Sequence, residues 1–249
     1  MSSLDITYKH LDEFVPRDYM VAPEIDPSRT ALLAMDIQKL IVDPKGAAYV
    51  QSVGGAPEGK DTVEPCNVVI RRCREVGIPV FWSLWGLRGD GLDAGACKAK
   101  WPGLEPGTPS SPATWGHRDA ELDDNVVKPL ASEPQMYKHR FSSFYNTPFD
   151  EYLRELGRDT VVIVGVTSAN CAHATCIDGW NKNYKMVVLA DTATAVPHPR
   201  KDQPLGTGQH WEALRNIQMN YGDVLTSKEF FAKVEAGLAK NKAASARTR

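Results

Sequence analysis

The stretch VVIVGVTSANCAHAT, residues 161–175, combines the pattern of a buried strand, a turn and the start of a helix. Its first part is an apolar, β-branched run typical of a buried strand, and small and polar residues then lead directly into a helix. Cys171 therefore falls at or near the first turn of that helix, where unpaired backbone N–H groups and the helix dipole favour a thiolate. A cysteine at such a turn is more often a small buried residue, so its position alone does not establish a nucleophile.

Two other strands carry polar residues in a similar way. The run TALLAMD (30–36) is typical of a buried parallel strand and ends in Asp36, and QMYKHRF (135–141) is a short strand containing Lys138. Open α/β sheets place their functional groups at the carboxyl ends of strands. Asp36 and Lys138 are therefore candidates to lie beside Cys171, although turn capping and a solvated surface charge are the commoner roles for each taken singly.

Strands and helices alternate along most of the chain. This alternation predicts an α/β fold with three layers, α/β/α, built on a doubly wound, mainly parallel six-stranded sheet of Rossmann-like type. The strands are expected at 30–36, 78–84, 135–141, 160–166, 185–190 and 222–226, and helices at 63–76, 147–157, from about 170 to 180, around 211–217 and around 230–238.

Residues 86–134 differ from this pattern because they are rich in glycine and proline and have few periodic stretches. A segment of this length inside a compact domain is usually a lid, a binding loop or an oligomer contact. We expect residues 1–240 to form a single domain that includes 86–134 as a long lid or loop, and residues 241–249 to form a disordered tail.

The composition and charge of the chain argue against several classes of function. The chain has 249 residues, 42% hydrophobic, and a formal net charge of -2, so no long-range field favours nucleic acid or an anionic membrane surface. Five cysteines at irregular spacing, without a CxxC motif, indicate reduced thiols rather than a disulfide framework or a zinc site. The absence of a signal-peptide pattern and of a long apolar run predicts a cytoplasmic protein with no membrane partner.

With ALLAMDIQ around Asp36, YKHRFSSF around Lys138 and GVTSANCAHAT around Cys171, the sequence resembles the isochorismatase-like family of cysteine hydrolases. Members include N-carbamoylsarcosine amidase, ureidoacrylate and biuret hydrolases, and nicotinamidase. The resemblance covers roughly residues 28–226 by order of elements. It implies the isochorismatase-like hydrolase fold and a catalytic triad of these three residues.

The resemblance also implies a mechanism. Asp36 would act as general base and later protonate the leaving amine, Lys138 would hold that carboxylate in place, and Cys171 would form a thioester with the substrate. The family carries a non-proline cis peptide that matches the bond Val166–Thr167. In that arrangement the backbone N–H groups of Thr167 and Cys171 would form an oxyanion hole.

Two features indicate which branch of the family the sequence resembles. Isochorismatase proper cleaves a vinyl ether without a cysteine nucleophile, so Cys171 favours an amidohydrolase. Nicotinamidases add a metal site of one Asp and two His after the second strand, but the matching stretch FWSLWGLRGDG (81–91) has no histidine. We therefore predict an enzyme with no cofactor and no metal, acting on a carbon–nitrogen bond other than a peptide bond.

The expected partner is a small-molecule amide or ureido substrate, and relatives suggest a homodimer or homotetramer. Aromatic and polar residues near the strand ends are candidates to bind the substrate or to pack the lid. Three alternatives stay open: a non-catalytic binding protein on the same fold, an isochorismatase-type ether hydrolase, and a thiol redox sensor that pairs Cys171 with Cys176. The substrate-binding candidates are Trp82, Trp85, Phe144, Tyr145, Gln209 and His210.

Overall fold

The computed structural model describes residues 11–18, 23–52, 55–196 and 208–247. Within these residues six strands form one sheet, in which every neighbouring pair is parallel. The strand order is β3-β2-β1-β4-β5-β6, the doubly wound arrangement. The predicted fold class is confirmed. The strands are β1 (Thr30–Met35), β2 (Val80–Trp85), β3 (Gln135–Lys138), β4 (Thr160–Gly165), β5 (Lys185–Leu189) and β6 (Asp223–Leu225).

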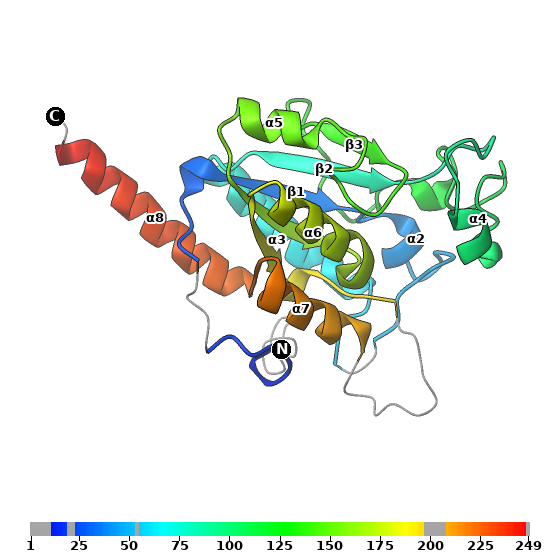
Figure 1. Cartoon of the computed structure of the whole chain (residues 1–249), viewed down its shortest axis with the longest axis horizontal. Helices are drawn as coiled ribbons and strands as arrows, with labels where there is room; N and C mark the ends of the chain where they lie inside the picture. Colours follow the sequence, from blue (N-terminus) through cyan, green and yellow to red (C-terminus); the bar gives the residue numbers. More distant parts are fainter. Residues whose placement is uncertain (1–10, 19–22, 53–54, 197–207, 248–249) are drawn as a thin grey trace.

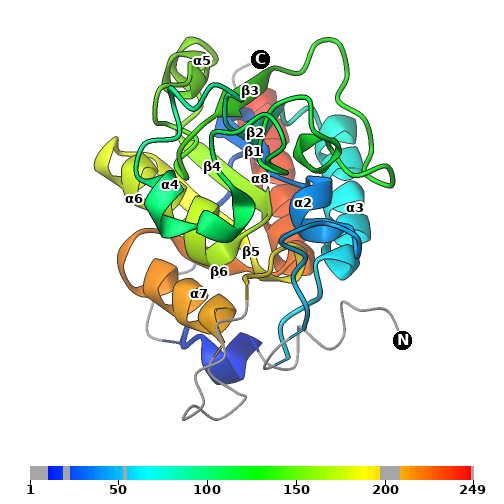
Figure 2. The same cartoon turned by 90° about the vertical axis from the view of Figure 1, so that its right-hand side faces the viewer.

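Helices cover both faces of the sheet (Figure 1). In Figure 2, α3 and α8 lie on one face, and α5, α6 and α7 lie on the other. Short helices and turns occupy the connections between these elements. The bounds are α2 (Lys39–Val42), α3 (Val63–Glu75), α4 (Cys97–Lys100), α5 (Phe149–Glu155), α6 (His173–Asn181), α7 (Gln209–Asn220) and α8 (Ser227–Arg247).

The central strands are apolar throughout because both of their faces are covered. Every residue of β1 and of β4 is buried, as expected for parallel strands between two helical layers. Alternate residues enter opposite cores: Leu32 packs with the layer of α3 and α8, and Leu33 with the layer of α5, α6 and α7. The result is a rigid platform under the carboxyl ends of β1 and β4.

A glycine allows β1 and β4 to approach closely at their carboxyl ends. Gly165 pairs with Met35 and has φ +105, and a Cβ added to it would lie 2.0 Å from the Met35 carbonyl oxygen. No side chain fits at that distance. Asp36 follows directly on one strand and Val166 on the other, so this contact brings the two connecting segments together at the point where the chain changes direction around the sheet.

The segment 86–134 is largely irregular, as expected, and holds α4 and two short turns, η3 (Pro102–Leu104) and η4 (Arg118–Ala120). An isolated bridge between Gln38 and Leu122 ties it to the turn after β1, and a second bridge, Leu87 with Thr114, lies within the segment itself. In Figure 1 the arrowheads of β1 and β2 point to the side where α2 and α4 lie. The segment therefore lies at the carboxyl end of the sheet.

The end of the chain differs from the expected disordered tail. The helix α8 continues to Arg247, so residues 241–247 are helical, and residues 248–249 lie outside the described residues. The stretch is rich in alanine and lysine, which are strong helix formers. Asn241 also donates a hydrogen bond of 2.9 Å to Asp26, which anchors this part of the helix to the start of β1. None of the helices in the described ranges is both long and apolar enough to cross a bilayer.

Candidate active site

Asp36 stands at the first position after β1, in a backbone conformation that few residues adopt. Its φ is 50, in the left-handed region, where Asp is better tolerated than most residues. Its backbone N–H donates to the Ser83 carbonyl of β2 at 2.8 Å, which fixes the turn. The side chain is buried, and its Oδ1 atom has no hydrogen-bond partner among the described residues. One carboxylate oxygen is thus available to a proton donor.

Lys138 joins Asp36 to Cys171. Its Nζ lies 2.7 Å from Asp36 Oδ2 and 3.2 Å from Cys171 Sγ, and it also donates to the Arg140 carbonyl at 3.4 Å. An ammonium group has three N–H donors, so this one is fully used. The structure therefore brings together the three residues that the sequence places at separate strand ends, and all three are buried.

Burial and charge set the protonation of this trio. Burial alone would lower the pKa of Lys138, but the neighbouring Asp36 and Cys171 raise it, so Lys138 stays cationic. Burial raises the pKa of Asp36 against the opposing effect of Lys138, which makes Asp36 a stronger proton acceptor than a free carboxylate. The raised pKa values of both residues suit Asp36 to act as a base that is held in place by the positive charge of Lys138.

The thiol of Cys171 differs from the expectation for a helix N-terminus. Burial, reinforced by the charge of Asp36 and opposed by Lys138, raises the pKa of Cys171 to about 12. Removal from water outweighs the helix dipole here, because charging a group in a buried site costs more than one turn of N–H groups returns. The resting thiol is therefore protonated at neutral pH, and it needs a base to become a nucleophile.

The turn before Cys171 has the backbone geometry that the resemblance implies. The peptide bond Val166–Thr167 is cis, and residues Ser168–Ala172 form a single wide helical turn before α6. The backbone N–H of Ser168 donates to the Thr194 carbonyl at 2.7 Å. The Thr167 N–H has no acceptor among the described residues. Thr167 and Cys171 both line the same cavity.

This cavity opens at the carboxyl ends of β1 and β4 and has a volume of about 200 Å³. Its polar lining residues are Asp36, Gln38, Thr167, Asn170 and Cys171. The rest of the wall is apolar, and its larger members are Leu40, Ile41, Trp85, Trp101, Leu104 and Phe141. A small molecule can thus reach Cys171 with one polar end and one apolar end.

Comparison with known proteins identifies the family of this chain. The isochorismatase domain family model matches residues 30–229. The chain belongs to the isochorismatase family. It is 30% identical over 212 residues to the ureidoacrylate amidohydrolase RutB of Methylobacterium radiotolerans, and the match covers 80% of this chain and 76% of the relative. The expected family is confirmed, and the chain is a hydrolase of that family.

Solved structures agree with the isochorismatase-family assignment. A cysteine hydrolase from Pseudomonas syringae pv. phaseolicola is 26% identical with a TM-score of 0.76, and the match covers 88% of this chain and 98% of that one. N-carbamoylsarcosine amidase from Thermoplasma acidophilum is 25% identical with a TM-score of 0.60, over 80% of this chain and 96% of that one.

Of the predicted substrate-binding residues, Trp85 lines the cavity and the others lie elsewhere. Trp85 lines the cavity, because it ends β2 at the carboxyl edge of the sheet. Trp82 lies three residues earlier, inside the core, where its Nε1 donates to Glu133 at 2.7 Å. Phe144 stacks on Tyr184 in the opposite core. Tyr145 is half exposed and contacts the His139 ring instead of the cavity.

Two further candidates lie at the start of α7. Gln209 is its first residue and is not among the described residues that line the cavity. His210 is buried behind the turn Ser168–Ala172, with its Nδ1 atom 3.0 Å from Ser168 Oγ. Its Nε2 has no partner among the described residues. His210 therefore supports the turn from behind and does not line the cavity.

Buried His210 gives the chain a measurable pH dependence of stability. Burial lowers the pKa of His210 from 6.5 to about 3, so between these values the unfolded chain binds a proton that the folded chain does not. Through this residue the free energy of unfolding should fall by about 1.4 kcal/mol per unit as pH drops from 6 to 4. Urea denaturation across this window should give a shallower pH slope for His210→Gln. The partly exposed His173→Gln is the control, and equal slopes for the parent and His210→Gln would contradict this account.

Sequence reasoning did not single out Gln38 as a site residue. Its Nε2 donates to the carbonyls of Trp85 at 2.8 Å and Ala120 at 2.6 Å, and its Oε1 accepts from the Trp85 N–H at 2.8 Å. Gln38 thus ties the end of β2 and the segment 86–134 to the turn after β1. The signal was available, since Gln38 follows β1 by three residues and lies next to the candidate base.

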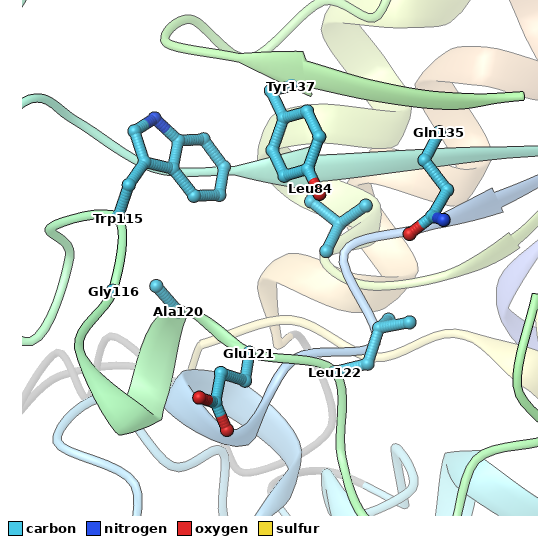
Figure 3. Close-up of a pocket in the computed structure, with 8 residues that line it drawn as sticks. All are labelled: Leu84, Trp115, Gly116, Ala120, Glu121, Leu122, Gln135 and Tyr137. Atoms are coloured by element: carbon cyan, nitrogen blue, oxygen red, sulfur yellow. The ribbon is translucent and has the colours of Figure 1, made fainter.

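A second hollow, of about 400 Å³, lies beside the edge strand β3 (Figure 3). Trp115 and Tyr137 meet there edge to face, with ring centroids 5.0 Å apart. Asp36, Lys138 and Cys171 are not among the residues that line it. Trp115 therefore belongs to the packing of the segment 86–134 and not to the cavity at Cys171.

Proposed function

We propose that this chain is a metal-independent cysteine amidohydrolase that cleaves the C–N bond of a small carboxamide, ureido or N-carbamoyl substrate through a thioester. The observation that carries the proposal is the buried contact of Lys138 Nζ with both Asp36 and Cys171 at the floor of a small cavity. Relatives named ureidoacrylate amidohydrolase and N-carbamoylsarcosine amidase support the reaction class.

In the first half-reaction, Asp36 takes the proton from the Cys171 thiol as the sulfur attacks the substrate carbonyl carbon. The free Oδ1 atom of Asp36 is the acceptor, because Oδ2 is held by Lys138. The carbonyl oxygen becomes an oxyanion, which accepts hydrogen bonds from the backbone N–H groups of Thr167 and Cys171. Asp36 then returns its proton to the leaving nitrogen, and ammonia or an amine departs.

In the second half-reaction, water hydrolyses the thioester. Asp36, again ionised, removes a proton from the water as its oxygen attacks the same carbonyl carbon. The C–S bond breaks, and the sulfur recovers that proton from Asp36. The products are the free thiol and a carboxylic or carbamic acid, which ionises by releasing its remaining proton to solvent. No change of oxidation state occurs, and Lys138 stays cationic throughout because it neutralises the negative charge that alternates between Asp36 and Cys171.

An ammonia-release screen tests the function. Purified protein should release ammonia from at least one of a panel of primary amides, ureido acids, N-carbamoyl amino acids, biuret and nicotinamide. Activity should survive exhaustive dialysis against a chelator, since every group in the proposed steps comes from the chain. Loss of activity on chelation with recovery on adding a divalent metal would contradict the metal-independent mechanism. No group of three or more metal-ligand side chains occurs in the described part of the chain.

Release of no ammonia or amine from any member would favour the non-catalytic binding protein. The redox alternative has less support, because Cys176 is fully buried and all five cysteines are free. A homodimer or homotetramer, a single domain and a cytoplasmic location complete the proposal, and sedimentation would test the first of these.

A further inference from the structure

We infer that the cavity selects a neutral amide with an apolar, preferably aromatic, distal group, and that it disfavours substrates carrying a carboxylate. This inference rests on the proposed amidohydrolase function and names its substrate class. The basis is a one-sided distribution of polarity around Cys171, together with three aromatic rings that form a wall.

The aromatic wall comes from three separate parts of the chain. Trp85 ends β2, Phe141 follows β3, and Trp101 lies between α4 and η3 in the segment 86–134. The rings of Trp85 and Trp101 are perpendicular with centroids 6.2 Å apart, and those of Trp101 and Phe141 are 5.4 Å apart. Rings in this arrangement offer flat apolar surface to a flat apolar group.

Among the described residues that line the cavity, Asp36 is the one charged side chain, and it lies at the Cys171 end. Asn170 accepts a bond from Thr167 Oγ1 at 3.0 Å, so its amide lies within the nucleophile turn. The side chain of Gln38 makes three hydrogen bonds to backbone groups and is fully committed. Trp85 Nε1 is a buried donor without an acceptor among the described residues, and it is neutral. The distal part of a substrate therefore meets no charged group in the described wall.

No lysine or arginine is among the described residues that line the cavity. Lys138 uses its three donors on Asp36, Cys171 and a carbonyl. Lys39, close in sequence to the lining, is bonded to Glu121 and Asp124. Arg140 donates from Nη1 to the carbonyls of Asp93 and His139, and it is not among the described residues that line the cavity. A buried anion without a partner is strongly unfavourable, and an ionised Asp36 would add repulsion.

The volume sets the size of the group. A cavity of about 200 Å³ is somewhat larger than the roughly 150 Å³ that holds a benzene ring in a protein core. A carboxamide joined to one ring through a short linker fits this space. An amide joined to a carboxylate instead of a ring would contact less of the apolar wall. Its carboxylate would also lose hydrogen bonds to water.

The test compares substrates matched in the scissile bond. We expect kcat/KM for 3-phenylpropanamide to exceed that for succinamate at least tenfold, and the methyl ester of 3-ureidopropionate to exceed the free acid by a similar factor. Trp101→Ala should reduce the first ratio at least fivefold. The control Trp180→Ala replaces an exposed tryptophan on α6, away from the cavity, and should leave the ratio within twofold.

A variant that should weaken the preference for neutral substrates provides the second arm. Leu104→Arg introduces a guanidinium at the rim of the wall and should raise kcat/KM for the two anions relative to their neutral partners about tenfold. Leu104→Gln, polar but uncharged, should change that ratio less than threefold. Equal or better turnover of the anions by the parent enzyme would overturn the inference while leaving the amidohydrolase function intact. Hydrolysis of no substrate would instead overturn the proposed function on which the inference rests.

Discussion

Cys171→Ala should abolish turnover, lowering kcat by a factor of about 10⁴ to 10⁶, which is the loss seen when a covalent nucleophile is removed from a hydrolase. The reason is that no other group at the cavity floor can form the thioester. Lys138 is a fully bonded cation and Asp36 is needed as the base. The measurement is steady-state ammonia release with the best substrate of the screen.

The fold should survive this change. Alanine removes a single sulfur atom from a buried site, which costs about 1 kcal/mol, so thermal unfolding should shift by only a few degrees. Cys73→Ala is the matched control: this thiol is equally buried, but it lies in α3 on the other side of the sheet. It should lose similar stability and keep its activity. Full activity in Cys171→Ala, or equal loss in Cys73→Ala, would refute the assignment of the nucleophile.

Lys138→Met should be among the most destabilising single changes in the chain. It leaves Asp36 as an uncompensated carboxylate in a buried site, which costs about 3–5 kcal/mol in the free energy of unfolding. Activity should fall as well, because the pKa of Asp36, already raised by burial, would rise further and leave less ionised base at neutral pH. Urea denaturation at pH 7 measures the first effect, and the pH dependence of kcat measures the second.

Two comparisons separate charge from packing at Lys138. Lys182→Met removes a partly exposed lysine that pairs with Asp150 at 3.2 Å, and it should cost less than about 1 kcal/mol. The double variant Asp36→Asn/Lys138→Met removes both charges and should recover most of the lost stability without recovering activity. If the double variant is no more stable than Lys138→Met, the loss comes from packing and the ion-pair account fails.

The fold could be predicted because its strands are long apolar runs with clear breaks. Buried parallel strands such as β1 and β4 have no polar face. The helices before β2 and β4 are each followed by a glycine with positive φ, Gly77 and Gly157. The extension of α8 beyond Lys240 differs from the predicted disordered tail, because a polar, charged composition is shared by disordered segments and exposed helices, and the alanine content of this stretch favours the helix.

The three central site residues could be located because strand ends fix them. Asp36, Lys138 and Cys171 follow or end parallel strands, and the carboxyl ends of such strands meet at one edge of the sheet. The distances between their side chains, and the protonated state of the thiol, could not be read in this way. The helix-terminus argument gave the opposite sign for the Cys171 pKa, because sequence does not show how completely a turn is removed from water.

The cavity wall was the least predictable part. Alternation along β2 carries Trp82 into the core and leaves Trp85 at the edge, a difference that depends on where the strand ends. Trp101 and Leu104 come from a segment whose conformation follows no periodicity, so composition could indicate aromatic density but not its placement. The shape of that segment depends on individual contacts such as the hydrogen bond from Gln38 to Ala120, and a sequence pattern does not predict such contacts.

The pairing of Gly165 with Met35 gives the enzyme an unusual kind of sensitivity. Adding one methyl group at residue 165 would push apart the backbones that lead to Asp36 and to Cys171, since the new carbon would lie 2.0 Å from the Met35 oxygen. The catalytic machinery would then be misaligned although every reacting side chain was still present. A mutational scan that scored chemistry by functional groups alone would overlook this position, and an effort to engineer new activities on this scaffold should leave it unchanged.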